Sequence, residues 1–283
     1  MQRIMNLHWT NIQRKRLVEL DADARTLAQT FENADQRNRA FQAWEKVRVS
    51  DHHHRLEALR SGSRQPRLCR LETALVKALV ANGFVHVPTP VLMSRGLLAK
   101  MSITADHPLF DQVYWVDKDK CLRPMLAPHL YYVIRDLLRL WEKPIRIFDV
   151  GPCFRRETEG AKHAAEFTML NLCEFGLPEE ERRQRLEWLT ALIMDQAGID
   201  RYGLESETSA VYGPTVDVVS EDGLELGSAA MGPHPLDRAW SITDTWVGIG
   251  FGLERLLMAA EGGTNLSRFG RSIAYLDGIR LNI

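Results

Sequence analysis

The residues best suited to chemistry lie between two extended runs, 145–154 and 166–175, that are rich in branched and aromatic side chains. Such runs favour strands, and the charged stretch between them contains one glycine, so we expect a long antiparallel hairpin. The hairpin presents Arg155 where its first strand ends. A guanidinium held there offers a fixed fork of N–H donors that matches phosphate oxygens two at a time. The pattern indicates a phosphate-binding group, with a solvated hairpin tip as the alternative.

A second chemical segment is a glycine-rich strand that runs into an apolar helix, GIGFGLERLL at 248–257. Together with FRRE at 154–157 and EFTMLN at 166–171, it resembles motifs 3 and 2 of the class II aminoacyl-tRNA synthetases. GFVHVPTP at 83–90 resembles their motif 1. Each motif is weak alone, but three in this order at family-like separations are specific. The resemblance implies an α+β fold with an antiparallel sheet flanked by helices, ATP and Mg²⁺ as cofactors, and a homodimer built on motif 1.

The resemblance also assigns site residues. It makes two arginines catalytic: Arg155 on the α-phosphate and the substrate carboxylate, and Arg255 on the γ-phosphate. The other ATP-binding positions that it implies are Glu157 at the adenine amino group, Phe167 stacked on the ring, His163 on a loop that closes over the nucleotide, and Glu225 and Ser228, which are also its Mg²⁺ ligands. The alternatives are a core position for Phe167 and a merely exposed strand position for Glu225.

The chemistry of adenylate formation fits these residue types. A carboxylate is already a nucleophile toward the α-phosphorus of ATP, so the protein needs no general base. It has to hold the reactants in line and neutralise phosphate charge. The sequence contains no GxSxG, P-loop or HExxH motif, which excludes three common hydrolase and nucleotide-binding arrangements.

Within the class, the resemblance is strongest to the pyrrolysyl-tRNA synthetase family, in the short form that lacks a separate N-terminal tRNA-binding domain. LRPMLAPHLYYVIRDL at 122–137 and LDRAW at 236–240 carry it, together with the motif 2 and motif 3 segments. It implies ATP-dependent activation of pyrrolysine and its transfer to an amber-suppressor tRNA. The pocket residues that it assigns, around a long acyl-lysine side chain, are Ala127, Leu130, Tyr131, Ile134, Asn171, Cys173, Tyr212, Ala230 and Trp246.

The residue types agree with such a substrate. Aromatic and aliphatic walls suit an aliphatic stem and a bulky ring, and the Asn171 amide can donate to a side-chain carbonyl. His129 and Ile134 depart from the Asn and Leu of many relatives, which leaves the preference among acyl-lysines open. Two alternatives remain: a class II synthetase for phenylalanine or phosphoserine, and a synthetase-like regulatory or binding protein that charges no tRNA. The last is disfavoured because the residues of the ATP site are all present.

The elements that hold these residues can be placed along the chain. Apolar positions at helical spacing predict a helix from Leu68 that stops at Asn82-Gly83, and a strand over 84–91 that its prolines confine to a sheet edge. Further expected elements are a strand pair over 113–116 and 121–125, helices from Pro128, over 179–197 and over 251–260, and strands over 211–219, 224–231 and 246–250. Residues 68–283 are therefore expected to form one catalytic domain.

The composition is ordinary for a globular protein, but the charge is unevenly distributed. The net charge of the 283 residues is −1, yet residues 1–70 contain 14 Lys and Arg against 8 Asp and Glu. We expect residues 1–60 to form a helical appendage that contacts tRNA phosphates, followed by a linker at 61–67. The alternative is that the apolar stripe of this appendage covers the catalytic domain and its charges face water. The four cysteines form no CxxC pair, and no apolar run approaches the ~18 residues of a membrane span. Because no signal-peptide pattern is present, we expect a cytoplasmic protein without a membrane partner.

Overall fold

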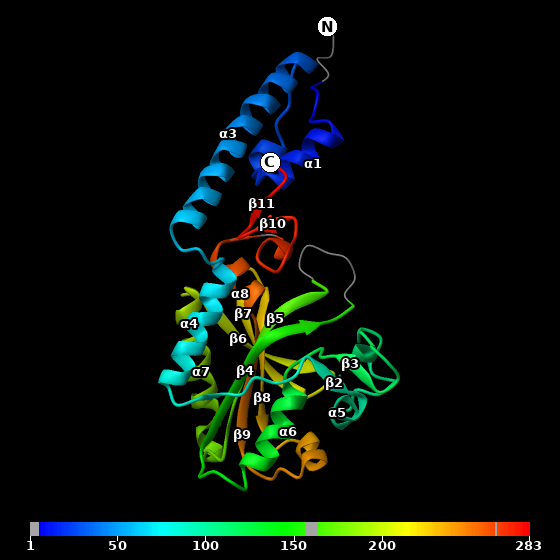
Figure 1. Cartoon of the computed structure of the whole chain (residues 1–283), viewed down its shortest axis with the longest axis vertical. Helices are drawn as coiled ribbons and strands as arrows, with labels where there is room; N and C mark the ends of the chain where they lie inside the picture. Colours follow the sequence, from blue (N-terminus) through cyan, green and yellow to red (C-terminus); the bar gives the residue numbers. More distant parts are fainter. Residues whose placement is uncertain (1–5, 157–163, 264) are drawn as a thin grey trace. The chain divides into compact units, whose positions relative to one another are not determined.

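The computed structural model describes residues 6–156, 164–263 and 265–283 (Figure 1). Backbone contacts divide the chain into two compact units. One unit is Arg67–Arg271, and the other joins Met1–Pro66 with Ser272–Ile283. The expected division keeps all residues after the linker in one domain, whereas the structure groups the C-terminal segment with the N-terminal one.

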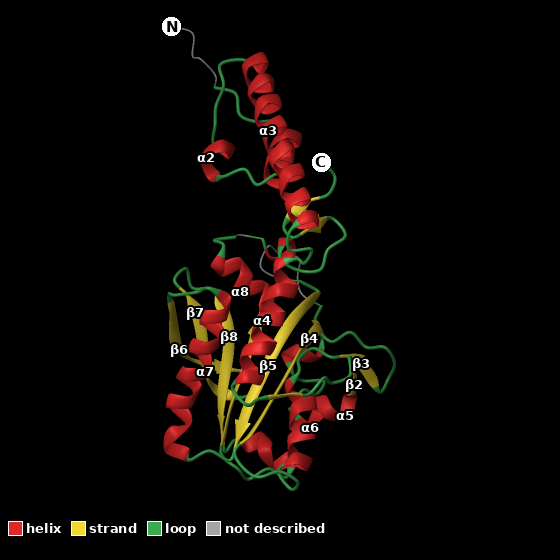
Figure 2. Cartoon of the chain, turned by 60° about the vertical axis from the view of Figure 1, so that its left-hand side comes forward, coloured by secondary structure: helices red, strands yellow, loops and turns green. Residues whose placement is uncertain are grey.

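The larger unit is built on a central sheet (Figure 2). The sheet has seven strands in the order β1-β4-β5-β9-β8-β7-β6. Its strands are β1 (Val85–His86), β4 (Ile145–Phe154), β5 (Glu166–Phe175), β6 (Tyr202–Ser209), β7 (Gly213–Ser220), β8 (Glu225–Gly232) and β9 (Trp246–Gly252). Neighbouring strands are antiparallel except β1 and β4, which are parallel, so the sheet is mixed. The predicted hairpin is confirmed, because β4 and β5 have the predicted bounds and pair along their whole length.

The two faces of the sheet bury different side chains. Alternate residues of a strand point to opposite faces, so Leu170 and Leu172 of β5 join one apolar cluster while Cys173 and Phe175 join another. The first cluster includes residues of the helices α4 (Arg67–Ala81), α7 (Arg182–Ala197) and α8 (Leu253–Ala260). The second includes residues of α5 (Arg95–Lys100), α6 (Ala127–Leu137) and the 3-10 helix η3 (Pro235–Trp240). Helices therefore cover both faces of the sheet.

Two helices end at the glycines that the sequence indicates. After α4 the chain turns at Gly83, with φ of 80°, and α7 ends at Gly198, with φ of 70°. Glycine enters this left-handed region without a steric cost. The first turn predicted for the helix over 179–197 is instead a 3-10 helix, η2 (Glu179–Glu181), which precedes α7.

Prolines shorten the predicted motif 1 strand. Only Val85 and His86 pair with β4, at the sheet edge as predicted. The chain then continues to β2 (Leu92–Ser94), which pairs with β3 (Lys120–Leu122). Proline has no N–H to donate to a ladder, so the prediction of a strand over 84–91 is wrong beyond its first residues.

Other differences arise where local patterns are weak. The pair expected over 113–116 and 121–125 is reduced to a bridge between Trp115 and Cys121. Strand β6 is absent from the predicted elements because YGLESETS has few apolar positions, and its pairing with β7 forms it. The last core strand, β9, extends to Gly252, so α8 begins later than predicted.

The smaller unit confirms a helical N-terminal segment. It contains α1 (Asn11–Glu19), α2 (Ala24–Leu27) and the long α3 (Ala34–Ser61), with the hairpin of β10 (Tyr275–Leu276) and β11 (Ile279–Arg280). Helix α3 contacts β11, and Arg16 donates to the carbonyl of Asn282 at 3.1 Å. In the part of the chain that the structure describes, no helix is both long and apolar enough to cross a membrane.

A buried carboxylate ties α8 to the sheet. The two carboxylate oxygens of Glu254 accept the backbone N–H of Thr168 on β5 at 2.8 and 2.9 Å, and Glu254 is only 2 % exposed. Arg271 donates to the Thr168 hydroxyl at 2.8 Å. Burial raises the pKa of Glu254 above its ordinary value of 4.5, and the bonds to Thr168 oppose that rise.

This raised pKa predicts how stability changes with pH. A carboxyl group whose pKa is raised in the folded state contributes most below its unfolded value and loses that contribution as pH rises through the folded value. The free energy of unfolding of the parent, minus that of Glu254→Gln, should therefore fall as pH rises from about 4.5 toward neutrality. The slope should reach at most about 1.4 kcal/mol per pH unit. Urea titrations at several pH values measure it.

The control for this measurement is Glu180→Gln, because Glu180 is an exposed glutamate before α7. Its unfolding free energy should follow that of the parent at every pH. A constant difference between the parent and Glu254→Gln across the pH range would contradict the assigned pKa direction.

Candidate active site

Strand β5 supplies one wall of a cavity of about 460 Å³. Phe167, Met169, Asn171, Cys173 and Phe175 alternate along the strand and therefore point to one face of the sheet. All of them line the cavity. The sequence pattern EFTMLNLCEF thus places its odd-numbered residues at the site and its leucines in the core behind the sheet.

Strand β9 makes room for this cavity. The residues opposite Met169, Asn171 and Cys173 in the register of β5 and β9 are all glycines. A Cβ atom at Gly250 would lie 2.7 Å from Cε of Met169, closer than carbon atoms pack. Glycines are therefore needed at these positions of β9, because larger residues would fill the space above the sheet.

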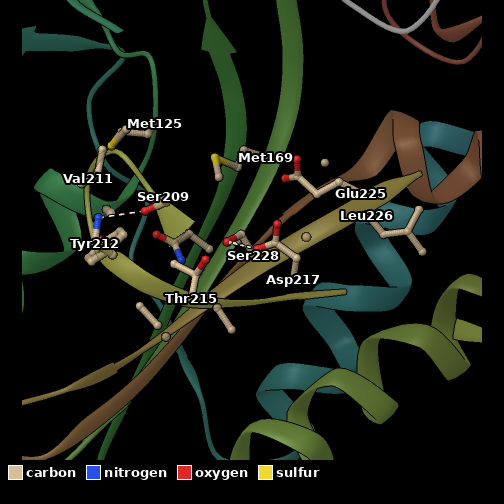
Figure 3. Close-up of a pocket in the computed structure, with 18 of the residues that line it drawn as sticks. Met125, Met169, Ser209, Val211, Tyr212, Thr215, Asp217, Glu225, Leu226 and Ser228 are labelled. Atoms are coloured by element: carbon tan, nitrogen blue, oxygen red, sulfur yellow. Dashed lines mark hydrogen bonds between the residues drawn. The ribbon is translucent and has the colours of Figure 1, made fainter. Parts of the chain in front are cut away.

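The cavity gathers most of the residues that the sequence singles out (Figure 3). Those of the ATP site are Arg155, Phe167, Glu225, Ser228 and Arg255, and those of the amino-acid pocket are Ala127, Leu130, Tyr131, Asn171, Cys173, Tyr212, Ala230 and Trp246. Ile134 is not among the lining residues, because it lies one turn further along the same stripe of α6 and is fully buried in the apolar cluster. Glu157 and His163 lie outside the described residues.

Two arginines line the polar part of the cavity. Nε of Arg155 donates to the carbonyl of Pro124 at 2.9 Å, and the guanidinium lies 5.3 Å from the centroid of the Phe167 ring. Nη1 of Arg255 lies 3.4 Å from a carboxylate oxygen of Glu225, and the Arg255 side chain is 28 % exposed. Both cations are thus anchored yet reach the cavity, the arrangement that phosphate binding requires.

Three side chains with oxygen atoms line the same cavity: Glu225, which contacts Arg255, and the pair Ser228 and Asp217. Ser228 on β8 donates to a carboxylate oxygen of Asp217 on β7 at 2.6 Å, and Glu225 lies at the start of β8 (Figure 3). Glu225 and Ser228 have opposite parity, but the register of β7 and β8 shifts between Val218 and Val219, so both line the cavity.

Asp217 is missing from the sequence-based site, although its signal is present. The run Thr215–Val218 alternates polar and apolar residues, which in a strand directs Thr215 and Asp217 to one face. Carboxylate and hydroxyl oxygens are the hard ligands that Mg²⁺ prefers, and Mg²⁺ commonly uses one or two carboxylates with substrate phosphates. The set of Glu225, Ser228 and Asp217 therefore fits Mg²⁺.

A buried aspartate, Asp237, orients the aromatic walls in the apolar part of the cavity, and it is absent from the residues that the sequence predicts for the site. Asp237 of η3 accepts the Tyr131 hydroxyl at 3.1 Å, the Trp246 indole N–H at 2.9 Å and the His234 backbone N–H at 2.6 Å. The rings of Tyr131 and Trp246 meet edge to face, with centroids 5.8 Å apart. One carboxylate, 3 % exposed, thus fixes the orientation of two aromatic walls.

Few groups in this apolar part carry charge. Burial raises the pKa of Tyr131, of Tyr212 and of the Cys173 thiol, which keeps all of them protonated. Cys173 is therefore a wall rather than a nucleophile. Asn171, 9 % exposed, gives one of its two amide hydrogens to the carbonyl of Ile249 at 2.8 Å, which fixes the direction of the other.

The site therefore combines two cations and a set of oxygen ligands with an apolar chamber that contains one oriented amide. Such an arrangement can hold a polyphosphate at the charged part and a long, mostly apolar side chain in the chamber. The described lining residues offer no activated nucleophile, which suits a reaction in which the substrate itself supplies one.

Comparison with known proteins agrees with this geometry. The family profile of the tRNA synthetases class II core domain (F) matches residues 21–276. A crystal structure of pyrrolysyl-tRNA synthetase from Desulfitobacterium hafniense is 54% identical, with a TM-score of 0.92, over 98% of this chain and 99% of that one. A second pyrrolysyl-tRNA synthetase structure from D. hafniense is 51% identical, with a TM-score of 0.91, over 100% of this chain and 98% of that one.

A more distant relative is the phenylalanine–tRNA ligase alpha subunit of Thermosynechococcus vestitus, 26% identical over 184 residues and 60% of this chain. The match spans about half of that relative, 51% of its length. The profile covers nearly the whole chain. The two D. hafniense structures cover 98% and 100% of it, and their sequence identities are well above the level at which only a fold is shared. The chain belongs to the class II tRNA synthetases, in the family of pyrrolysyl-tRNA synthetase.

Proposed function

We propose that the chain is an AMP-forming aminoacyl-tRNA ligase that activates pyrrolysine with ATP and transfers it to an amber-suppressor tRNA. The observation that carries the proposal is the continuity of one cavity from two phosphate-reading arginines to an apolar chamber with an oriented amide. The names of the two D. hafniense relatives support the choice of amino acid.

In the first step, a carboxylate oxygen of the amino acid bonds to the α-phosphorus of ATP, and the bond to the leaving pyrophosphate breaks. Arg155 holds the α-phosphate and the incoming carboxylate, and Arg255 holds the γ-phosphate. Phe167, beside the Arg155 guanidinium, offers a flat surface for the adenine ring. Glu157 and His163, outside the described residues, are proposed to contact adenine and to close over the nucleotide.

Glu225, Ser228 and Asp217 would hold Mg²⁺, which supplies positive charge to the phosphates. The Arg255 guanidinium already contacts Glu225, so the Glu225 carboxylate orients the guanidinium toward the γ-phosphate. In the second step, a tRNA hydroxyl attacks the carbonyl of the adenylate, and AMP leaves.

Tyr131, Trp246 and Cys173 surround the chamber for the amino-acid side chain. The second amide hydrogen of Asn171 would donate to the side-chain amide carbonyl of pyrrolysine. The likeness to a phenylalanine–tRNA ligase subunit raises phenylalanine as a competing substrate. It fits less well because its ring leaves that buried amide hydrogen without an acceptor. Pyrophosphate exchange with pyrrolysine, measured against the twenty ordinary amino acids and phosphoserine, tests the assignment.

For tRNA we propose the smaller unit as a phosphate-binding surface. Its exposed cations include Arg14, Lys15 and Arg39. Contacts of this kind add affinity without sequence information and weaken with salt. We also propose a homodimer through motif 1, since β1 lies at the edge of the sheet.

Replacing Arg255 tests the phosphate site. Arg255→Ala should lower pyrrolysine-dependent pyrophosphate exchange at least about 100-fold, the scale of losing a charge-stabilising donor. The fold should persist because the side chain is 28 % exposed. Arg183→Ala is the control, since that arginine pairs with Glu187 on the surface of α7. Exchange near the parent rate in Arg255→Ala would overturn the assignment of motif 3.

Replacing Asn171 tests its proposed hydrogen bond to the side-chain amide of the substrate. Asn171→Ala should lower kcat/KM for pyrrolysine by roughly 2- to 12-fold, the value of one net hydrogen bond, and by more if a buried group stays unpaired. The enlarged chamber should accept bulkier side chains, and KM for ATP should stay constant. If the variant activates pyrrolysine as well as the parent does, Asn171 does not read the substrate amide.

Replacing Arg14, Lys15 and Arg39 together by alanine tests the tRNA surface. Filter binding at several salt concentrations should give weaker tRNA affinity and a salt slope reduced by roughly 0.7–0.9 per lost phosphate contact. Amino-acid activation should not change. Lys118→Ala serves as the control, because its side chain is 90 % exposed on the larger unit. An unchanged slope in the triple variant would place tRNA elsewhere.

A further inference from the structure

Two His-Pro-Leu segments, 107–109 and 234–236, repeat the same local structure. Each opens a 3-10 helix, η1 (Pro108–Phe110) and η3 (Pro235–Trp240), with its histidine at the N-cap. Nδ1 of His107 accepts the backbone N–H of Leu109 at 3.1 Å, and Nδ1 of His234 accepts that of Leu236 at 3.2 Å. Since proline has no N–H, the leucine N–H is the first donor of each helix that needs a partner.

Both histidine rings also reach the same loop. Nε2 of His107 lies 3.2 Å from the carbonyl oxygen of Ala210, and Nε2 of His234 lies 2.6 Å from that of Tyr212. A carbonyl only accepts and a backbone N–H only donates, so in each ring Nε2 carries the hydrogen and Nδ1 is the acceptor. These contacts fix one tautomer in both rings.

The loop joins β6 to β7 and consists of residues 210–212, so the histidines bind its first and last carbonyls. Strand β6 is the last strand of the sheet, and its ladder holds this hairpin from one side. The bonds from η1 and η3 therefore attach the loop to elements far away in sequence, on the face of the sheet that carries the cavity.

Tyr212 makes this attachment relevant to binding. Its side chain lines the cavity (Figure 3). Its ring lies edge to face with that of Trp246, with centroids 6.3 Å apart. Its own N–H donates to Ser209 Oγ at 2.8 Å, a contact within the hairpin that does not fix the hairpin over the chamber. His234, by contrast, donates to the carbonyl of Tyr212 itself. Loss of this hydrogen bond would therefore displace a residue that forms part of the chamber wall.

We propose that His107 and His234 are positioning residues that hold the loop 210–212, and with it Tyr212, over the apolar chamber. They act through Tyr212 and touch no reacting atom. Their effect is on affinity for the amino-acid side chain, not on the phosphate chemistry of Arg155 and Arg255. The identity of that amino acid rests on the proposed function, while the attachment of the loop does not.

Two substitutions at each position separate the loop contact from the helix cap. The amide oxygen of asparagine replaces Nδ1 as an N-cap acceptor, but asparagine is too short to reach the loop. Glutamine carries an amide N–H near the position of Nε2 and can still donate to the loop carbonyl. His107→Asn and His234→Asn therefore keep the caps and release the loop, while His107→Gln and His234→Gln keep the loop contact.

The first measurement is hydrogen exchange of the loop in the full chain without substrate. Each asparagine variant should speed exchange of the amides at 210–213 by roughly 2- to 10-fold, the effect of one net hydrogen bond. The glutamine variants should stay near the parent. The control is His54→Asn, because His54 is exposed on α3, and it should leave the loop unchanged.

The second measurement is pyrophosphate exchange with pyrrolysine. The asparagine variants should raise KM for the amino acid by roughly 2- to 10-fold, with little change in kcat or in KM for ATP. The double variant should raise it further, and glutamine should restore it. A purely structural role would lower kcat and thermal stability instead.

The outcomes are distinguishable from failure of the proposed function. If the parent activates another amino acid but the loop responds as stated, the positioning role stands and KM is measured with that amino acid. If asparagine variants match the parent in both loop exchange and KM, the proposal is overturned. It is equally overturned if glutamine and asparagine variants behave alike.

Discussion

The register between β5 and β9 is the constraint on which the active site depends. It sets glycines opposite Met169, Asn171 and Cys173, so along this stretch only β5 carries side chains on the cavity face, and β9 contributes Trp246 at the end of the pairing. Protein interiors otherwise fill to crystal-like density. The cavity is thus a property of backbone pairing, and the residues around it select what enters.

Three acidic residues divide the work of the site according to their exposure. Glu254 and Asp237 are 2 % and 3 % exposed, and each receives backbone or side-chain N–H or O–H donors that compensate its burial. They fix an α-helix and two aromatic rings. Glu225, with a side chain 50 % exposed, contacts Arg255 and stays accessible to a cation. Burial therefore separates the acids that support the walls from the acid that we propose holds Mg²⁺.

Much of this site can be predicted from the sequence because its signals are local. The runs at 145–154 and 166–175 become β4 and β5 with the same bounds, and alternation along β5 assigns its cavity face. The roles of Asp237, His107 and His234 are harder to predict, because their hydrogen-bond partners lie far along the chain and no periodicity connects them. The bulge between β7 and β8, beside which Glu225 and Ser228 both line the cavity, is likewise a tertiary feature.

The pairing of the chain's two terminal segments in one unit has a consequence for biosynthesis. Residues 272–283 leave the ribosome after residues 67–271, so α3 cannot find β11 until synthesis of the catalytic part has finished. Residues 67–271 contain all the strands of the main sheet and can pair them first. The N-terminal segment, although translated earliest, is then completed last, with a long loop-closure entropy to overcome. The contact between α3 and β11 is therefore the last step in the vectorial folding of this protein.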